Sequence, residues 1–98
     1  MYRQGDVLVV PAEEVPVDAR KADDCVVARG EVTGHAHRIA SGAEQFVTPD
    51  GRQFVRVLAP FVDLVHEDHG ALRLPGPGVY RIVHQREYVP GSIRRVRD

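Results

Sequence analysis

The sequence predicts an all-β protein, a single small barrel or sandwich of about seven or eight short strands spanning residues 1–98. Valine, which favours strands, occupies seventeen of the 98 positions. Gly and Pro turn signals interrupt the apolar runs about every eight to twelve residues, as in sandwiches and barrels. No segment keeps an apolar period of 3.6 over the length of a convincing helix. Because a small open sheet leaves exposed edges, closure into a barrel or a compact sandwich is expected.

The first part of the chain is expected to hold three strands and a long loop. Val7–Val10 is an apolar run that ends at Pro11 and predicts a strand buried on both faces. Residues 11–24 carry two prolines and many charges, which favours a loop with one helical turn near residues 12–15. Residues 25–28 predict a second strand, and residues 31–39 alternate in a way that predicts a third.

The second part of the chain predicts a hairpin followed by three more strands. These strands are expected at residues 45–48, 53–58, 61–66, 71–74 and 79–88. Asp50-Gly51 forms the hairpin turn, because Asp-Gly tolerates the positive φ of tight turns. In the last strand, alternation places Tyr80, Ile82, His84 and Tyr88 on one face, which we expect to point inward.

Charge and composition argue against several classes of function. Thirteen basic and fourteen acidic residues give a net charge of −1, which disfavours general binding of polyanions. The basic tail at residues 92–97 suggests an RNA or phosphate contact, but twelve of the thirteen basic residues are arginine and asparagine is absent. This bias is typical of a GC-rich bacterial genome, and six aromatic residues offer few platforms for stacking bases. Nucleic-acid binding is therefore not expected.

Cysteine content and hydropathy limit the redox and membrane classes. One cysteine, Cys25, excludes an internal disulfide framework and a zinc site built on several cysteines. It begins an apolar run, where a buried, inert thiol is expected. No apolar run approaches the roughly 20 residues of a membrane span, and the N-terminus lacks a signal-peptide core. A soluble, cytoplasmic protein with no membrane partner is expected.

The most informative feature is a set of closely spaced histidines. His35 and His37 form an H-x-H pair, and residues two apart in a strand face the same way, so both imidazoles can reach one metal ion. His66 and His69 form an H-x-x-H pair at the end of another predicted strand. If the two segments meet, these four side chains form one site for a divalent ion such as zinc, iron or nickel. The alternative is that they are polar turn and strand-end residues without an ion.

Three further side chains are candidates for supporting roles. Glu31 precedes the H-x-H pair and Glu67 lies inside the H-x-x-H pair, so either carboxylate could orient an imidazole. Glu31 can also act as a general base, but a solvated strand residue is the favoured interpretation. His84 is expected on the inward face of the last strand, either as a supporting residue of the site or as a hydrogen-bonded core histidine.

The H-x-H segment resembles the first metal motif of cupins, small β-barrels that bind iron, manganese or nickel. Gly30 leads the segment, and His35 and His37 match the pair of histidines. Cupins place a glutamate shortly after this pair, whereas Glu44 comes later in this chain. The resemblance implies a metal-binding barrel and a metalloenzyme.

The second cupin motif is matched less well. Residues 75–78 are similar to its Pro/Gly element, but no histidine follows at the expected distance, since Arg81 occupies that region and His84 comes too late. His66 and His69 have no counterpart in the cupin pattern. The resemblance covers about a third of the chain.

The string GEVTGHAH at residues 30–37, together with QREY at residues 85–88, resembles a family of small uncharacterised bacterial and phage proteins. That family implies no function. Nucleophilic catalysis has little support, because the chain has no G-x-S-x-G elbow and no phosphate-binding loop.

The hypothesis that the sequence favours is a metal-binding protein with a histidine cluster, its enzymatic form being a cupin-like metalloenzyme. The alternative is a non-catalytic interaction module, or an accessory subunit of a bacterial or phage system, that binds another protein or a second copy of itself through edge strands. Three or more histidines gathered in one place favour the first hypothesis, and histidines scattered over the surface favour the second.

Overall fold

The computed structural model describes residues 1–29 and 34–85, which form ten β-strands and no α-helix. The strands are β1 (Tyr2–Gln4), β2 (Val7–Ala12), β3 (Arg20–Lys21), β4 (Val26–Arg29), β5 (Ala36–Ile39), β6 (Ala43–Val47), β7 (Gln53–Val57), β8 (Phe61–His66), β9 (His69–Pro75) and β10 (Gly78–His84). In this part of the chain, no helix is present that is long and apolar enough to cross a membrane.

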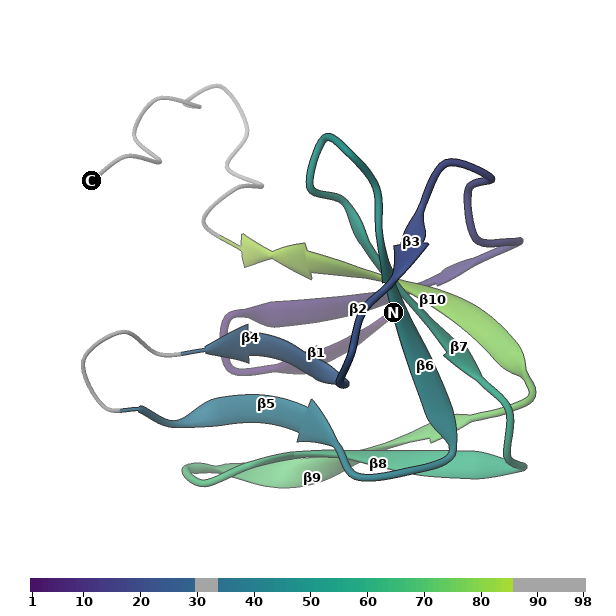
Figure 1. Ribbon diagram of the computed structural model, residues 1–98. Coiled ribbons are helices and arrows are strands. Elements are labelled where there is room, and N and C mark those ends of the chain that lie inside the picture. Colours follow the sequence, from purple (N-terminus) through teal and green to yellow (C-terminus); the bar gives the residue numbers. More distant parts are fainter. Residues whose placement is uncertain (30–33, 86–98) are drawn as a thin grey trace.

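The strands pack as a two-layer sandwich (Figure 1). A six-stranded antiparallel sheet has the order β1-β2-β10-β7-β6-β3, and a four-stranded sheet has the order β4-β5-β8-β9. The all-β prediction is confirmed, with ten strands instead of seven or eight. The barrel alternative is wrong, because no ladder between the described strands joins the two sheets. Short strands protect both edges of the larger sheet: β1 has three residues and β3 has two.

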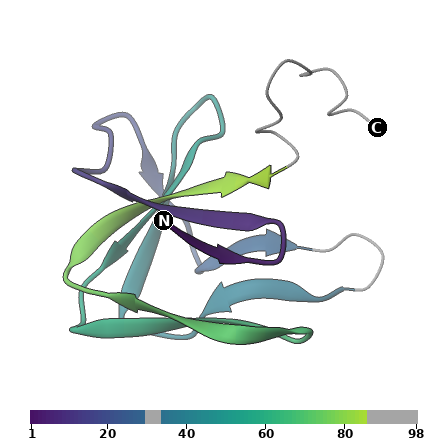
Figure 2. The same cartoon turned by 180° about the vertical axis from the view of Figure 1, so that it is seen from behind.

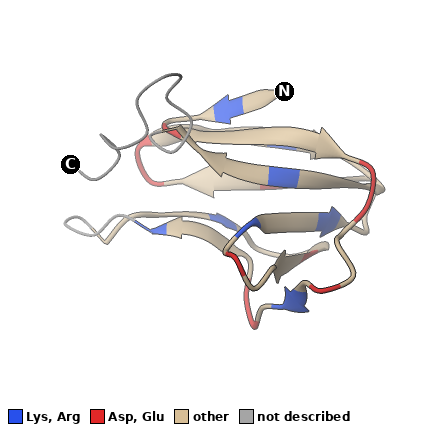
Figure 3. Cartoon of the chain, turned by 90° about the horizontal axis from the view of Figure 1, so that it is seen from above, with Lys and Arg blue, Asp and Glu red and all other residues tan. Residues whose placement is uncertain are grey.

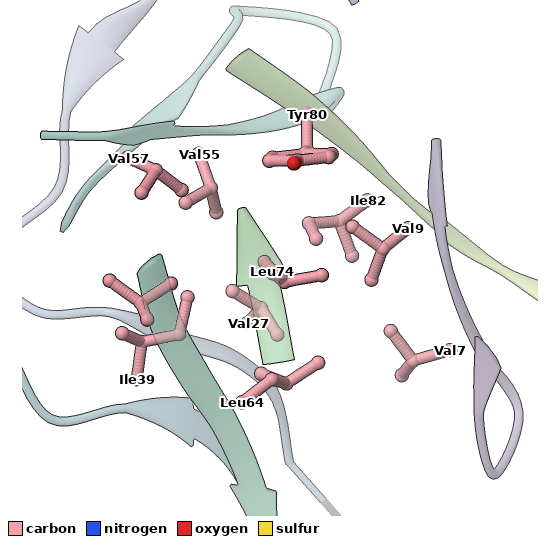
Figure 4. Close-up of a cluster of buried hydrophobic side chains, with 11 residues drawn as sticks. Val7, Val9, Val27, Ile39, Val55, Val57, Leu64, Leu74, Tyr80 and Ile82 are labelled. Carbon is pink, nitrogen blue, oxygen red and sulfur yellow. The ribbon is translucent and has the colours of Figure 1, made fainter. Parts of the chain in front are cut away.

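The core lies between the two sheets and is made of the aromatic ring of Tyr80 and aliphatic side chains that alternate along their strands (Figure 4). Val7, Val9 and Ile82 contribute from the larger sheet, and Leu64 and Leu74 from the smaller one. Leu64 and Leu74 are fully buried, so truncation of either to alanine would cost about 2–5 kcal/mol of stability. Tyr80 and Ile82 share the inward face of β10, as the alternation predicts.

The predicted strands are recovered, β1 is a further strand that was not predicted, and there are three other differences. β2 continues through Pro11 to Ala12, because β1 has ended there and a residue without an N–H is tolerated beside an open edge. β3 lies within the segment predicted as a loop and pairs with β6, and residues 12–15 contain no helical turn. β5 begins at Ala36, and the preceding segment at 30–33 lies outside the described residues, as do Tyr88 and the basic tail.

Turns from distant parts of the sequence meet at one end of the sandwich. Figures 1 and 2 show the β1–β2 turn, the start of β5, the β8–β9 turn and the end of β10 at the same end of the molecule. Figure 3 shows that basic and acidic positions are mixed in both layers instead of gathering on one of them. This end of the sandwich, here called the histidine end, carries the predicted site residues.

Candidate functional site

The two predicted histidine segments meet at the histidine end. The ring centroid of His66 lies 4.2 Å from that of His37 and 4.7 Å from that of His69. The rings of His37 and His69 are 6.0 Å apart and nearly parallel, with an angle of 15° between them. His35 contacts the ring of His66 edge-on at 5.8 Å. We call these four residues the histidine cluster.

Strand pairing explains why these side chains converge. Arg38 on β5 pairs with Val65 on β8, so continuing this antiparallel register by one residue places His37 opposite His66. His66 in turn pairs with His69 across the β8–β9 ladder, because Glu67 and Asp68 form a hairpin loop. The H-x-x-H spacing thus makes its two histidines cross-strand partners, whose side chains lie close together on one face of the sheet.

A buried glutamine fixes the orientation of His37. Gln4 ends β1, is 3% exposed, and donates from Nε2 to the carbonyl oxygens of Leu64 and Gly70, at 2.8 Å each. Because both amide hydrogens are used, Oε1 faces the Nδ1 atom of His37, at 2.9 Å. A neutral His37 therefore carries its proton on Nδ1 and presents the lone pair of Nε2 to the site. Ligating histidines are typically held in this way by a hydrogen bond at the other ring nitrogen.

His37 is the buried member of the cluster, with an exposed fraction of 6%. Burial lowers its pKa below the ordinary 6.5, because an imidazolium loses hydration inside the protein. The neighbouring imidazoles of His66, His69 and His84 lower the pKa further, and the Asp6 carboxylate opposes them. A neutral imidazole at neutral pH is the form that binds metals.

His69 approaches the β1–β2 turn closely because residue 5 is glycine. Gly5 has a φ of +62°, and a Cβ at this position would come within 2.6 Å of the Nε2 atom of His69. The next residue, Asp6, has its Oδ1 atom 3.9 Å from the Nε2 atom of His37. The Nε2 atoms of two histidines therefore lie at the same turn, beside an exposed carboxylate.

Asp68 contacts the two remaining members of the cluster. Its carboxylate accepts a hydrogen bond from the Nδ1 atom of His35 at 2.6 Å, which is a carboxylate–histidine pair of the kind found behind metal ligands. Its backbone N–H donates to the Nδ1 atom of His66 at 3.0 Å. A neutral His66 in this arrangement has its proton on Nε2, so it must release the Asp68 amide before Nε2 can bind an ion.

The carboxylate of Glu67 supports the backbone of β5 and not an imidazole. Its oxygens accept from the Ala36 N–H at 3.0 Å and from the Arg38 guanidinium at 3.3 Å. Hydrogen bonds from the backbone N–H groups of Ala36 and Glu67, and then from Arg38, lower the pKa of Glu67 to about 2. Glu67 thereby joins the β8–β9 turn to the strand that carries His37. Glu31, the other candidate carboxylate, lies outside the described residues.

His84 is oriented by a chain of glutamine side chains. Its Nε2 atom lies 2.7 Å from Oε1 of Gln53, whose Nε2 donates to the Val27 carbonyl at 2.8 Å and to Oε1 of Gln45 at 3.0 Å. Gln45 in turn donates to the carbonyl oxygens of Asp24 and Val26. This chain ties β10 and the β6–β7 hairpin to the other sheet at β4.

The arrangement is an assembled group of imidazoles and not a closed metal site. Among residues 1–29 and 34–85, no three His, Cys, Asp or Glu side chains have the geometry of a formed metal site. The reason is visible in the cluster: the rings lie side by side, and His66 uses Nδ1 for the Asp68 amide.

Two residues of this region were missed by the sequence-based prediction. Gln4 and Asp6 flank Gly5 in a short polar segment that looks like an ordinary turn. The signal available in the sequence was Gly5 beside Asp6, because glycine next to an acidic residue is typical of a tight turn. In the structure Gly5 has a positive φ. No local pattern in the sequence reveals the hydrogen-bond partners of Gln4, because one of them, the carbonyl of Leu64, lies 60 positions away.

Comparison with known proteins identifies a family without assigning an activity. No curated protein and no solved structure matches the chain. The profile of one family, described as a domain of unknown function (DUF8820), matches residues 3–85. This match covers all the described strands apart from the first residue of β1, and the chain therefore belongs to the DUF8820 family.

Proposed function

We propose that the protein binds one divalent transition-metal ion, such as zinc, iron or nickel, through the histidine cluster. The observation that carries this proposal is the convergence of His37, His66 and His69, whose ring centroids lie within 6.0 Å of one another. Imidazole nitrogen is a good ligand for all three metals. His35 adds a fourth ring in contact with His66.

The environment of the cluster supports ligation over a purely structural role. A structural stack of histidines needs hydrogen bonds but does not need a lone pair kept in place. Gln4 fixes His37 with Nε2 presented to its neighbours, and burial keeps that imidazole neutral. Bringing three imidazoles together is unfavourable if more than one is protonated, whereas an ion shared between them offsets the crowding.

The cupin resemblance supports only part of this proposal. The H-x-H pair contributes to the cluster, His37 on β5 and His35 just before it. Glu44 lies on β6 and forms ion pairs with Lys21 at 3.3 Å and Arg56 at 3.6 Å, so it occupies a different place from a metal-ligating glutamate. A metalloenzyme of cupin type would therefore need its carboxylate from another residue.

The test is metal binding by untagged protein. Protein stripped with a chelator at pH 7.5 is titrated with Zn²⁺ and Ni²⁺, and anaerobically with Fe²⁺, by isothermal titration calorimetry. We expect about one ion per chain. Elemental analysis of protein purified without a chelator checks which metal the chain acquires during expression. A chain that binds none of the three metals contradicts the proposal and returns the interaction module as the better hypothesis.

A further inference from the structure

We propose that Asp6 supplies a carboxylate ligand to the ion held by the histidine cluster, beside His37 and His69 at the β1–β2 turn. This inference rests on the proposed metal binding by the histidine cluster and adds the ligand that sets the class of metal. Asp6 carries no role in the sequence-based prediction.

The positions of three ligand atoms support the site. Oδ1 of Asp6 lies 3.9 Å from Nε2 of His37, whose direction is fixed by Gln4. Nε2 of His69 lies against Gly5, the residue directly before Asp6. Two donor atoms that each lie about 2.0–2.2 Å from one ion are roughly 3–3.5 Å apart. Closing the Asp6–His37 pair around an ion thus requires shortening the distance between the two atoms by about 0.4–0.9 Å.

The backbone of the turn is built for this approach. Gly5 adopts a φ of +62°, which other residues rarely adopt, and its missing side chain leaves room for the His69 ring. The backbone carbonyl of Asp6 accepts from the N–H of Gln85 at 2.7 Å, so the end of β10 holds the turn in place. The Asp6 carboxylate is then positioned by the backbone and needs only its own side-chain rotation to reach the ion.

A carboxylate changes what the site can bind and do. All-histidine sites favour zinc, copper and nickel, whereas histidines combined with a carboxylate also suit Fe²⁺ and Mn²⁺ and leave positions open on a six-coordinate ion. The Asp6 side chain is 67% exposed and His69 is exposed, so the open positions would face solvent. A site of this type binds a small molecule or water at the ion instead of serving as a closed structural centre.

The experiment compares Asp6→Asn with Asp18→Asn, a variant that removes one exposed carboxylate with the same change in charge from the 11–24 segment. Metal-free, untagged protein is titrated with Zn²⁺ and with Mn²⁺. We expect Asp6→Asn to weaken Zn²⁺ binding at least tenfold and to abolish measurable Mn²⁺ binding, with Asp18→Asn equal to wild type. Asp6→Glu, which keeps the carboxylate, should restore part of the Mn²⁺ affinity.

The outcomes separate the two proposals. If wild type binds metal and Asp6→Asn binds it equally well, Asp6 is not a ligand and metal binding by the histidines stands. If wild type binds neither ion, nor Ni²⁺ or Fe²⁺, both proposals fail. Circular dichroism and the Tm of the metal-free variants check that the fold is intact. Should Asp6→Asn not fold, Asp6→Ala takes its place: a Zn²⁺ affinity of Asp6→Ala equal to that of wild type would overturn a ligand role for Asp6.

Discussion

Gln4 and Gln53 each orient a histidine side chain by hydrogen bonding, at two different places in the sandwich. The Nε2 atom of each donates two hydrogen bonds, and the Oε1 atom of each faces a ring nitrogen, His37 for Gln4 and His84 for Gln53. The two glutamines contact different ring nitrogens of their histidines. Gln4 faces Nδ1 of His37, and Gln53 faces Nε2 of His84.

The two histidines differ more in their surroundings than in the glutamines that orient them. His37 lies among other imidazoles, and its second ring nitrogen, Nε2, faces the Asp6 carboxylate. His84 ends a chain of amides that finishes on backbone carbonyls of the β4 region, which is a tie between the two sheets. The same arrangement thus orients a ring nitrogen toward a carboxylate in one region and ties the two sheets together in the other.

The largest expected effect tests whether the histidine cluster binds as a unit. His37→Ala and His66→Ala should each lower Zn²⁺ affinity by more than about 100-fold, since loss of a ligand exceeds the 10–100-fold effect of a supporting residue. The double variant should cost little more than either single one, because ligands of one ion act together. Calorimetric titration of the three variants measures this.

His84→Ala is the control on the other side of the comparison. It should lower the free energy of unfolding, because Oε1 of Gln53 loses its partner, and leave Zn²⁺ affinity close to that of wild type. Additive effects of His37→Ala and His66→Ala would show that the two rings do not share an ion, despite their 4.2 Å separation.

The next effect compares the two glutamines directly. Gln4→Leu and Gln53→Leu each remove three hydrogen bonds from a side chain of similar volume, so each should lower the free energy of unfolding by about 2 kcal/mol or more. Gln4→Leu should also weaken Zn²⁺ binding about 10–100-fold, as expected for a residue that orients a ligand. Urea denaturation and calorimetric titration separate the two quantities. Equal metal affinities in the two variants would mean that Gln4 is only structural.

The sequence predicted the fold class well because alternation and turn chemistry are local. Asp50-Gly51 marks the β6–β7 turn, where Gly51 has a φ of +91°, and the inward face of β10 follows from alternation alone. The choice between barrel and sandwich is not local, since it depends on which edges pair. β3 was missed for a related reason: its two residues are exposed, charged and held only by pairing with β6.

The sequence analysis identified the histidines of the candidate site but not the residues that contact them. The spacing of His35 and His37, and of His66 and His69, shows which pairs share a segment, and the structure brings the segments together. What joins them is a register between β5 and β8 and a hydrogen bond from Gln4, contacts between residues about 30 to 60 positions apart. Local sequence composition does not predict contacts between residues that lie so far apart in the chain.

The smallest expected effect is on the pH dependence of stability in the metal-free protein. The folded-state pKa of His37 is lowered from 6.5, chiefly by burial, so between the two values the unfolded chain binds more protons than the folded one. Stability is therefore greatest above about pH 6.5 and falls as pH decreases below it.

Urea denaturation with a chelator at pH 7.5 and 5.5 should show lower stability at pH 5.5. His37→Asn, which can still donate to Gln4 but does not titrate, should show a smaller drop. A drop as large in His37→Asn as in wild type would assign the pH dependence to other groups. Glu67 is not one of them, because its contribution is lost only as pH falls from about 4.5 toward 2.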